Sequence, residues 1–150
     1  MSAPTDEALR VLAHQVGERL RQGRDHLVTA ESCTGGWIAK CVTDIAGSSD
    51  WFDCGLAAYS YEAKQALLGV RPQTLETHGA VSRETVIEMV SGALVNSGAS
   101  VAVDTLGRRS SSSTVTAMRC AGKRLRPHYR DWNACDALAA RDERVASQPS

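Results

Sequence analysis

The stretch TAESCTGG, residues 29–36, sets a carboxylate, a hydroxyl, a thiol and a second hydroxyl in consecutive positions before two glycines. A strand that turns sharply through glycines into a helix lifts a polar side chain out of a sheet and points the following N–H groups at its target. The nucleophile elbow of the α/β-hydrolases uses this geometry with a different sequence. A Ser–Thr–Gly turn that merely caps a helix is at least as common. The stretch alone therefore leaves catalysis and helix capping open.

A serine nucleophile needs a neighbour that takes its proton. In YSYEAK, Tyr59 follows a predicted strand and Lys64 lies five residues later in a predicted helix. His14, His26 and His78 are not placed by any motif, and we expect surface or capping roles for them. A lysine base requires its pKa to fall by about 3 units from about 10.4, which burial can supply. The alternative is that Lys64 is a solvated helix residue.

The elements that must position these residues follow from the hydrophobic pattern. Apolar residues three and four apart, Leu9, Leu12, Val16 and Leu20, predict a helix that ends at Gly23. Further along, the pattern predicts strands at 26–30, 55–60 and 100–103. It predicts helices at 37–42, at 61–68 and from an N-cap at Ser82 to Gly98. The last of these helices is expected to turn Val86, Val90, Ala93 and Leu94 inward. This alternation predicts an α/β layer fold.

The charge balance and the residue composition of the chain change after Val103. Residues 1–103 carry eight Lys and Arg against twelve Asp and Glu, whereas residues 104–150 carry nine against five and include a run of four serines. We expect an α/β domain over 1–103 and a basic Ser/Arg-rich tail of low order over 104–150, in which 132–138 alone hints at a helix. The tail's cations could contact phosphates, but we expect them to be solvated and do not expect nucleic-acid binding.

Composition also limits the metal sites, membrane segments and cellular location that we expect. The five cysteines form no C-x-x-C pair and no H-E-x-x-H occurs, so we expect a reducing compartment and no metal. No apolar stretch approaches the roughly 18 residues that span a bilayer. The start, MSAPTDEALR, has an acidic pair where a signal peptide carries basic residues, so we expect a cytoplasmic protein without a membrane partner.

Three segments together resemble a known family. TAESCTGGWIAKCVTDIAGSSDWF, AAYSYEAKQALLGV and HGAVSRETVIEMVSGAL are similar, in order and spacing, to the CinA C-terminal domain family, the nicotinamide-nucleotide amidases. The resemblance runs from about residue 8 to Val103. It implies a three-layer α/β fold, assembly into homo-oligomers, and hydrolysis of nicotinamide mononucleotide to nicotinate mononucleotide and ammonia, with a small-molecule nucleotide as substrate and with neither metal nor cofactor.

The resemblance also implies roles at the quoted motifs. Carried over residue by residue, Ser32 is the nucleophile and Tyr59 and Lys64 are the pair that activates it. Gly35 and Gly36 lie along the phosphate or oxyanion side of the substrate.

The other side chains of the turn receive less definite roles. Thr34 is expected to cap the helix or to hydrogen-bond the substrate. Glu31 either orients Lys64 or closes the strand, and both readings stay open. Cys33 is expected to point away from the elbow and to pack as a small apolar group.

After Val103 the sequence departs from the family pattern. The family continues with a Gly-rich loop, a strand and a long helix, whereas this chain reads VDTLGRRSSSS, as a divergent or frame-altered C-terminus would. Because missing strands leave unpaired edges, we expect an incomplete domain and an impaired amidase. The alternative is a non-catalytic α/β module that binds a nucleotide or a partner and carries a basic tail.

Overall fold

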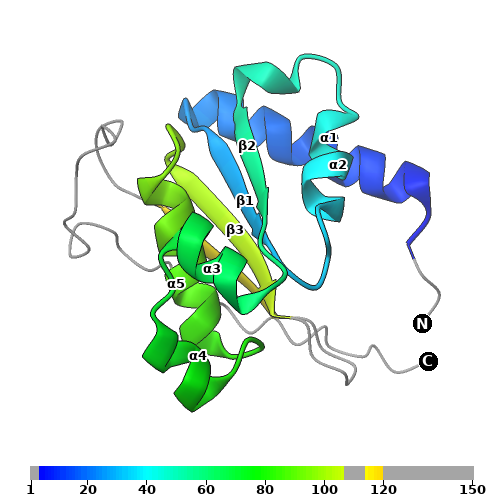
Figure 1. Cartoon of the computed structure of the whole chain (residues 1–150). Helices are drawn as coiled ribbons and strands as arrows, with labels where there is room; N and C mark the ends of the chain where they lie inside the picture. Colours follow the sequence, from blue (N-terminus) through cyan, green and yellow to red (C-terminus); the bar gives the residue numbers. More distant parts are fainter. Residues whose placement is uncertain (1–3, 107–113, 120–150) are drawn as a thin grey trace, which may run out of the picture.

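The computed structural model describes residues 4–106 and 114–119 as one four-stranded sheet with helices on both faces (Figure 1). Every helix in these two ranges is too short or too polar to span a membrane. In chain order the elements are α1 (Asp6–Gly23), β1 (Leu27–Glu31), α2 (Trp37–Thr43), the 3₁₀ turn η1 (Ser48–Asp50), β2 (Phe52–Ala57), α3 (Tyr61–Leu68), α4 (Pro72–His78), α5 (Arg83–Val95), β3 (Val101–Leu106) and β4 (Thr114–Arg119).

Strand β1 is the centre of the parallel part of the sheet. It pairs in parallel with β2 on one side and with β3 on the other, and β4 adds to β3 in antiparallel, giving the order β2-β1-β3-β4. The chain therefore leaves β1 toward one side for β2 and crosses to its other side for β3. In parallel α/β sheets such a reversal opens a crevice at the carboxyl ends of the strands, where ligands bind.

Successive residues of β1 face opposite helical layers, as the pleat requires. Val28 and Ala30 lie in a core built with α3, α4 and α5, whereas Leu27 lies in a second core built with α1 and α2. Figure 1 shows the same division, with α1 and α2 on one side of the sheet and α3, α4 and α5 on the other. The predicted three-layer α/β fold is confirmed.

Helices α3 and α5 cross in direct backbone contact. A Cβ added to Gly92 would lie 1.8 Å from the carbonyl oxygen of Leu68, a distance that no side chain tolerates. The predicted end of α3 at Gly69 and the predicted start of α5 at Ser82 are confirmed, whereas α5 ends at Val95, three residues before the predicted Gly98. Gly69 adopts a left-handed conformation after α3, and the Ser82 hydroxyl accepts the N–H of Thr85 at the start of α5. The lysine on α3 is thus carried by a tightly fixed helix.

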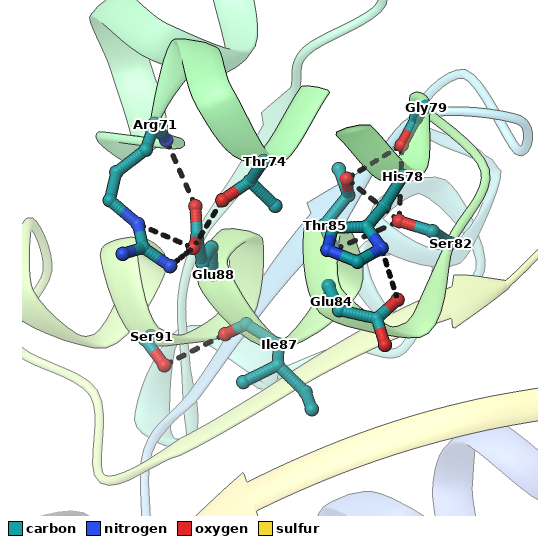
Figure 2. A network of polar contacts seen from close by, with 10 residues as sticks. All are labelled: Arg71, Thr74, His78, Gly79, Ser82, Glu84, Thr85, Ile87, Glu88 and Ser91. Carbon is teal, nitrogen blue, oxygen red and sulfur yellow. Dashed lines mark hydrogen bonds and ion pairs between the residues drawn. The ribbon is translucent and has the colours of Figure 1, made fainter. Parts of the chain in front are cut away.

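Helix α4 was not predicted, and a polar network attaches it to α5 (Figure 2). The carboxylate of Glu88 accepts hydrogen bonds from the Arg71 backbone N–H, from the Arg71 guanidinium and from the Thr74 hydroxyl. Burial by itself would raise the pKa of Glu88, but the bonds from Arg71 and Thr74 outweigh it and lower the pKa. These contacts fix α4 beside the α3–α5 pair.

The predicted inner face of the first helix is partly wrong. Leu20 is buried, but Leu12 is 56% exposed, and Ala13 and Gly17 take the inward positions. The cause is the buried Trp51, whose ring packs so closely on α1 that a Cβ at Gly17 would lie 2.7 Å from it. A periodicity read from leucines alone could not register a glycine that makes room for an aromatic ring.

The second strand was predicted too late in the chain. It occupies Phe52–Ala57 rather than 55–60, because its partner β1 ends at Glu31, directly opposite Ala57. Tyr59 and Ser60 consequently lie in the connection beyond the sheet. Ser60 caps α3 by accepting the N–H of Ala63.

The prediction that regular structure ends at Val103 is also wrong. Strand β3 continues to Leu106, and residues 114–119 of the predicted tail form β4, paired with it from Leu106–Thr114 to Val101–Arg119. Arg119 forms an ion pair with Asp25, with 2.8 Å between Nη2 and Oδ2. The strand begins with the β-branched residues TVT, but it is short and follows four serines, so it was assigned to the tail. The predicted helix at 132–138 lies outside the described residues.

Candidate active site

Three parallel strands end at the same edge of the sheet and bring the predicted chemistry together there. Ser32 directly follows β1, Lys64 comes from α3 after β2, and Asp104 belongs to the carboxyl half of β3. Residues two apart on a strand share a face. Asp104 therefore shares the face of Ala102, which lies against α5, and Ser32, one residue beyond the end of β1, contacts Lys64 of α3.

Lys64 makes the central contacts of the site. Its residue is fully buried, and its Nζ lies 2.9 Å from the Ser32 Oγ, 2.7 Å from the Ala58 carbonyl oxygen and 3.0 Å from that of Tyr59. Burial lowers the pKa of Lys64, and the nearby Asp104 raises it by less. The alternative that Lys64 is a solvated helix residue is wrong.

The two carbonyl groups determine how a neutral Lys64 would be oriented. Carbonyl oxygens accept and never donate, so each requires one N–H of the amine. A neutral amine has two N–H bonds and one lone pair. With both N–H bonds directed at Ala58 and Tyr59, the lone pair faces the hydroxyl of Ser32. In that neutral form the amine presents a proton acceptor to the Ser32 Oγ, whereas in the ammonium form Nζ donates to all three oxygens.

Glu31 holds the turn that carries Ser32. Its fully buried carboxylate accepts the backbone N–H groups of Gly36, Ile38 and Ala39, at 2.8–3.0 Å, and the hydroxyls of Thr29 and Thr34. Burial would raise the pKa of Glu31, but these hydrogen bonds outweigh it and lower the pKa. These contacts give Glu31 a role other than the two left open, because its side chain caps the start of α2 and makes no hydrogen bond to Lys64 within the described residues.

The glycine turn is arranged differently from the expectation for Gly35 and Gly36. The N–H of Gly35 donates to the Ser32 carbonyl, and that of Gly36 donates to Glu31. Both donors are therefore engaged within the turn itself. Both glycines have positive φ, +61° and +98°, which explains the choice of residue. Thr34 is not the helix cap, because its hydroxyl donates to Glu31 and the N-cap position belongs to Gly36.

Two predicted residues occupy the rim of the site. Tyr59 contacts Lys64 through its backbone carbonyl, while the residue as a whole is 79% exposed. The catalytic role of its phenol stays a prediction. Cys33 is an exposed free thiol, so the expectation that it packs as a small apolar group is wrong.

Asp104 is the charged residue that the sequence reasoning missed. It is fully buried beside Lys64, and burial raises its pKa to about 7, partly offset by the Thr105 N–H and the charge of Lys64. The available signal was an acidic residue directly after the apolar stretch SVAV, at the sheet edge that also carries Ser32. We had assigned it to the tail. Within the described residues, no group of three or more His, Cys, Asp or Glu could hold a metal ion.

Fold and site together define a three-layer α/β domain with a half-buried serine in contact with a buried lysine at the carboxyl edge of its sheet. Residues 9–116 match the sequence model of the CinA C-terminal domain. The chain belongs to the CinA C-terminal domain family, and the resemblance predicted from the motifs is confirmed.

Individual relatives agree with this assignment. The chain is 52% identical over 103 residues to the nicotinamide-nucleotide amidohydrolase PncC of Escherichia coli K12, a match that covers 69% of this chain and 62% of that protein. A protein of the same name from Enterobacter agglomerans is 50% identical, with 69% and 63% covered. The matched part of the chain thus spans less than two thirds of these curated relatives.

Solved structures show the same fold. The competence/damage inducible protein CihA of Agrobacterium tumefaciens superposes with a TM-score of 0.70 at 35% identity, covering 87% of this chain and 88% of that one. The competence damage-inducible protein A of Klebsiella pneumoniae gives 0.66 at 35% identity, with 73% of each chain covered.

Proposed function

We propose that this chain is an amidohydrolase that converts nicotinamide mononucleotide to nicotinate mononucleotide and ammonia, with Ser32 as nucleophile and Lys64 as base. The observation that carries the proposal is the 2.9 Å contact between Lys64 Nζ and Ser32 Oγ, made by a fully buried lysine. The substrate follows from the names of the relatives, which describe an amide-cleaving activity on a nicotinamide nucleotide.

The first half of the reaction forms an ester. Ser32 Oγ attacks the carboxamide carbon while Lys64 Nζ takes the hydroxyl proton, which gives a tetrahedral intermediate with negative charge on the former carbonyl oxygen. The Lys64 ammonium then returns the proton to the amide nitrogen. The carbon–nitrogen bond breaks, ammonia leaves, and the acyl group remains on Ser32.

The second half uses the same pair in reverse. Lys64 takes a proton from a water molecule as the water attacks the ester carbon, and then returns it to Ser32 Oγ as the ester carbon–oxygen bond breaks. The acid product gives its remaining proton to solvent and leaves as the carboxylate. Since the N–H groups of Gly35 and Gly36 are engaged within the turn, we assign the oxyanion contact to the N–H of Cys33, the residue after the nucleophile.

The remaining family properties are proposals of the same kind. We propose a homo-oligomer located in the cytoplasm that needs no cofactor for this chemistry. We also propose that the chain is slower than its relatives, because the Gly-rich loop of the family is replaced by DTLGRRSSSS. Tyr59 contributes its backbone carbonyl to hold Lys64.

Release of ammonia from nicotinamide mononucleotide tests the proposal. Ser32→Ala and Lys64→Met should each lower turnover by about 10²–10⁴-fold while the protein stays folded, because each removes one partner of the proton transfer. Cys33→Ala is the matched control beside the nucleophile and should retain turnover. If Cys33→Ala abolishes turnover and Ser32→Ala keeps it, the nucleophile is misassigned.

The same assay distinguishes an amidohydrolase from the alternative, a non-catalytic binding module. A non-catalytic module that binds a nucleotide or partner releases no ammonia at any protein concentration, and its Ser32→Ala variant binds as the parent does.

A further inference from the structure

Asp104 is a buried carboxyl group that the proposed reaction does not use. Its residue has no exposed surface, its Oδ1 accepts the N–H of Thr105 at 2.6 Å, and its Oδ2 has no hydrogen-bond partner among the described residues. An ionised carboxylate has about four acceptor sites to satisfy, so this one is far from satisfied. A buried carboxylate in that condition either binds a proton or depends on a nearby positive charge.

Among the described residues, the charges that act on Asp104 come from two places, α3 and the end of β1. Lys64 on α3 attracts it, and Glu31 at the end of β1 repels it. Helix α5, which packs on β3, turns Thr85 and apolar residues inward, while its Arg83 and Glu84 are exposed.

In the part of the chain that the structure describes, the remaining charges near β3 and α5 are engaged with other groups. Glu88 on α5 binds Arg71. On β4, Arg119 pairs with Asp25 at the opposite end of β3. Within residues 4–106 and 114–119, Lys64 is therefore the positive charge on which Asp104 depends.

We propose that Asp104 is a positioning residue that controls the protonation of Lys64, and with it the pH at which Ser32 can be activated. The ionised carboxylate stabilises the ammonium form of Lys64, in which no lone pair faces Ser32. When Asp104 holds a proton, that stabilisation disappears and the amine loses its own proton more readily. The catalytic part of this inference rests on the proposed role of Lys64 as base; the coupling between the two side chains does not.

The two groups must then titrate as a pair. Because the interaction free energy belongs to both, a change at one site shifts the other by the same amount in the opposite direction. An opposite charge at close range in a protein typically shifts a pKa by about 1–3 units. Either side chain therefore reports the coupling independently of any substrate.

The chain suits a direct measurement, because it contains three lysines, Lys40, Lys64 and Lys123. With lysine labelled at Cε by ¹³C, each amine gives its own NMR titration, and Lys64→Met identifies the Lys64 signal. In Asp104→Asn, which keeps shape and removes charge, we expect the Lys64 midpoint to fall by about 1 unit or more. The exposed Asp50→Asn is the matched control and should leave that midpoint unchanged.

The reciprocal experiment covers the case in which Asp104→Asn does not fold. With aspartate labelled at the carboxyl carbon, Lys64→Met should raise the Asp104 midpoint by the same number of units. An unchanged Lys64 midpoint in folded Asp104→Asn, or an unchanged Asp104 midpoint in Lys64→Met, overturns the proposal.

The rate of ammonia release tests the amidohydrolase assignment separately from the Asp104–Lys64 coupling. If both hold, the acid limb of kcat/KM for ammonia release moves to lower pH in Asp104→Asn by the shift seen for Lys64, while a purely structural loss lowers the rate without moving the limb. If the midpoints move but the parent chain releases no ammonia, the Asp104–Lys64 coupling stands and the amidohydrolase assignment fails.

Discussion

Replacing Glu31 by glutamine should destabilise the protein strongly although it changes one oxygen to an NH₂ group. In the parent, Oε1 accepts from Ala39 N–H and the Thr29 hydroxyl. Oε2 accepts from the N–H groups of Gly36 and Ile38 and from the Thr34 hydroxyl. A hydroxyl can rotate to accept from the new NH₂, but a backbone N–H cannot.

The loss of folding free energy in Glu31→Gln is set by the more favourable of the two orientations of the glutamine amide. With NH₂ in the place of Oε1, only the Ala39 N–H loses its acceptor, whereas in the place of Oε2 two backbone N–H groups would. One buried donor without a partner costs about 1–3 kcal/mol. The two remaining backbone bonds also lose their charge assistance, roughly half of their strength. We expect a total of about 2–4 kcal/mol, against a folding free energy of about 5–15 kcal/mol for a typical domain.

Urea unfolding followed by circular dichroism measures this difference, and its pH dependence gives a second check. The hydrogen bonds hold the pKa of Glu31 below its ordinary value of 4.5. A lowered pKa in the folded state contributes stability that is complete above that ordinary value and is lost as the pH falls through the folded one. The parent and Glu31→Gln curves should therefore be farthest apart at neutral pH and converge in acid.

The control for this experiment is Glu18→Gln, a substitution at an exposed position of α1, which should change stability by less than about 0.5 kcal/mol. The reasoning is refuted if Glu31→Gln loses no more than that control does at pH 7, or if the gap between parent and variant stays constant down to acid pH.

Three further outcomes follow from the structure. Gly92→Ala should destabilise by several kcal/mol, since its Cβ would overlap the Leu68 carbonyl, whereas Gly98→Ala meets no atom closer than 3.7 Å and serves as the control in thermal melts. Tyr59→Phe should keep kcat within about threefold, because a backbone carbonyl holds the lysine; a loss near 10²-fold would restore the phenol as an activating group. A chimera with a family-like second half after Val103 should release ammonia at least about 10²-fold faster than the parent, and equal rates would show that the replaced loop is dispensable.

The helices with local signals were the predictable part of the fold. Ser82 and Gly69 mark helix ends by chemistry that acts within a few residues, and the structure places the ends there. The end of β2 was misplaced because it depends on where a partner strand stops, which no local pattern records. Strand β4 was missed although Thr114, Val115 and Thr116 are β-branched, because it is short and directly follows the run of four serines that indicated a tail.

In the candidate site, too, some features could be predicted from the sequence and others could not. The motif brought Ser32 and Lys64 to notice, and they are in contact. The groups that orient Lys64 could not be predicted from residue types, because two of them are backbone carbonyls. Glu31 was noticed, but its role depends on three N–H groups that become adjacent only once α2 forms.

The central place of β1 also has a consequence for synthesis of the chain. His26, just before β1, donates its N–H to Ser100, just before β3, across 74 residues of sequence. Ribosomes add about 5–20 residues per second, so β1 waits roughly 4–15 seconds for its second neighbour. During that interval the nascent chain exposes an apolar strand edge that can pair with other chains. Ribosome-arrested chains that end before Val101 should therefore be digested by protease, and chains in which β3 has emerged should resist it.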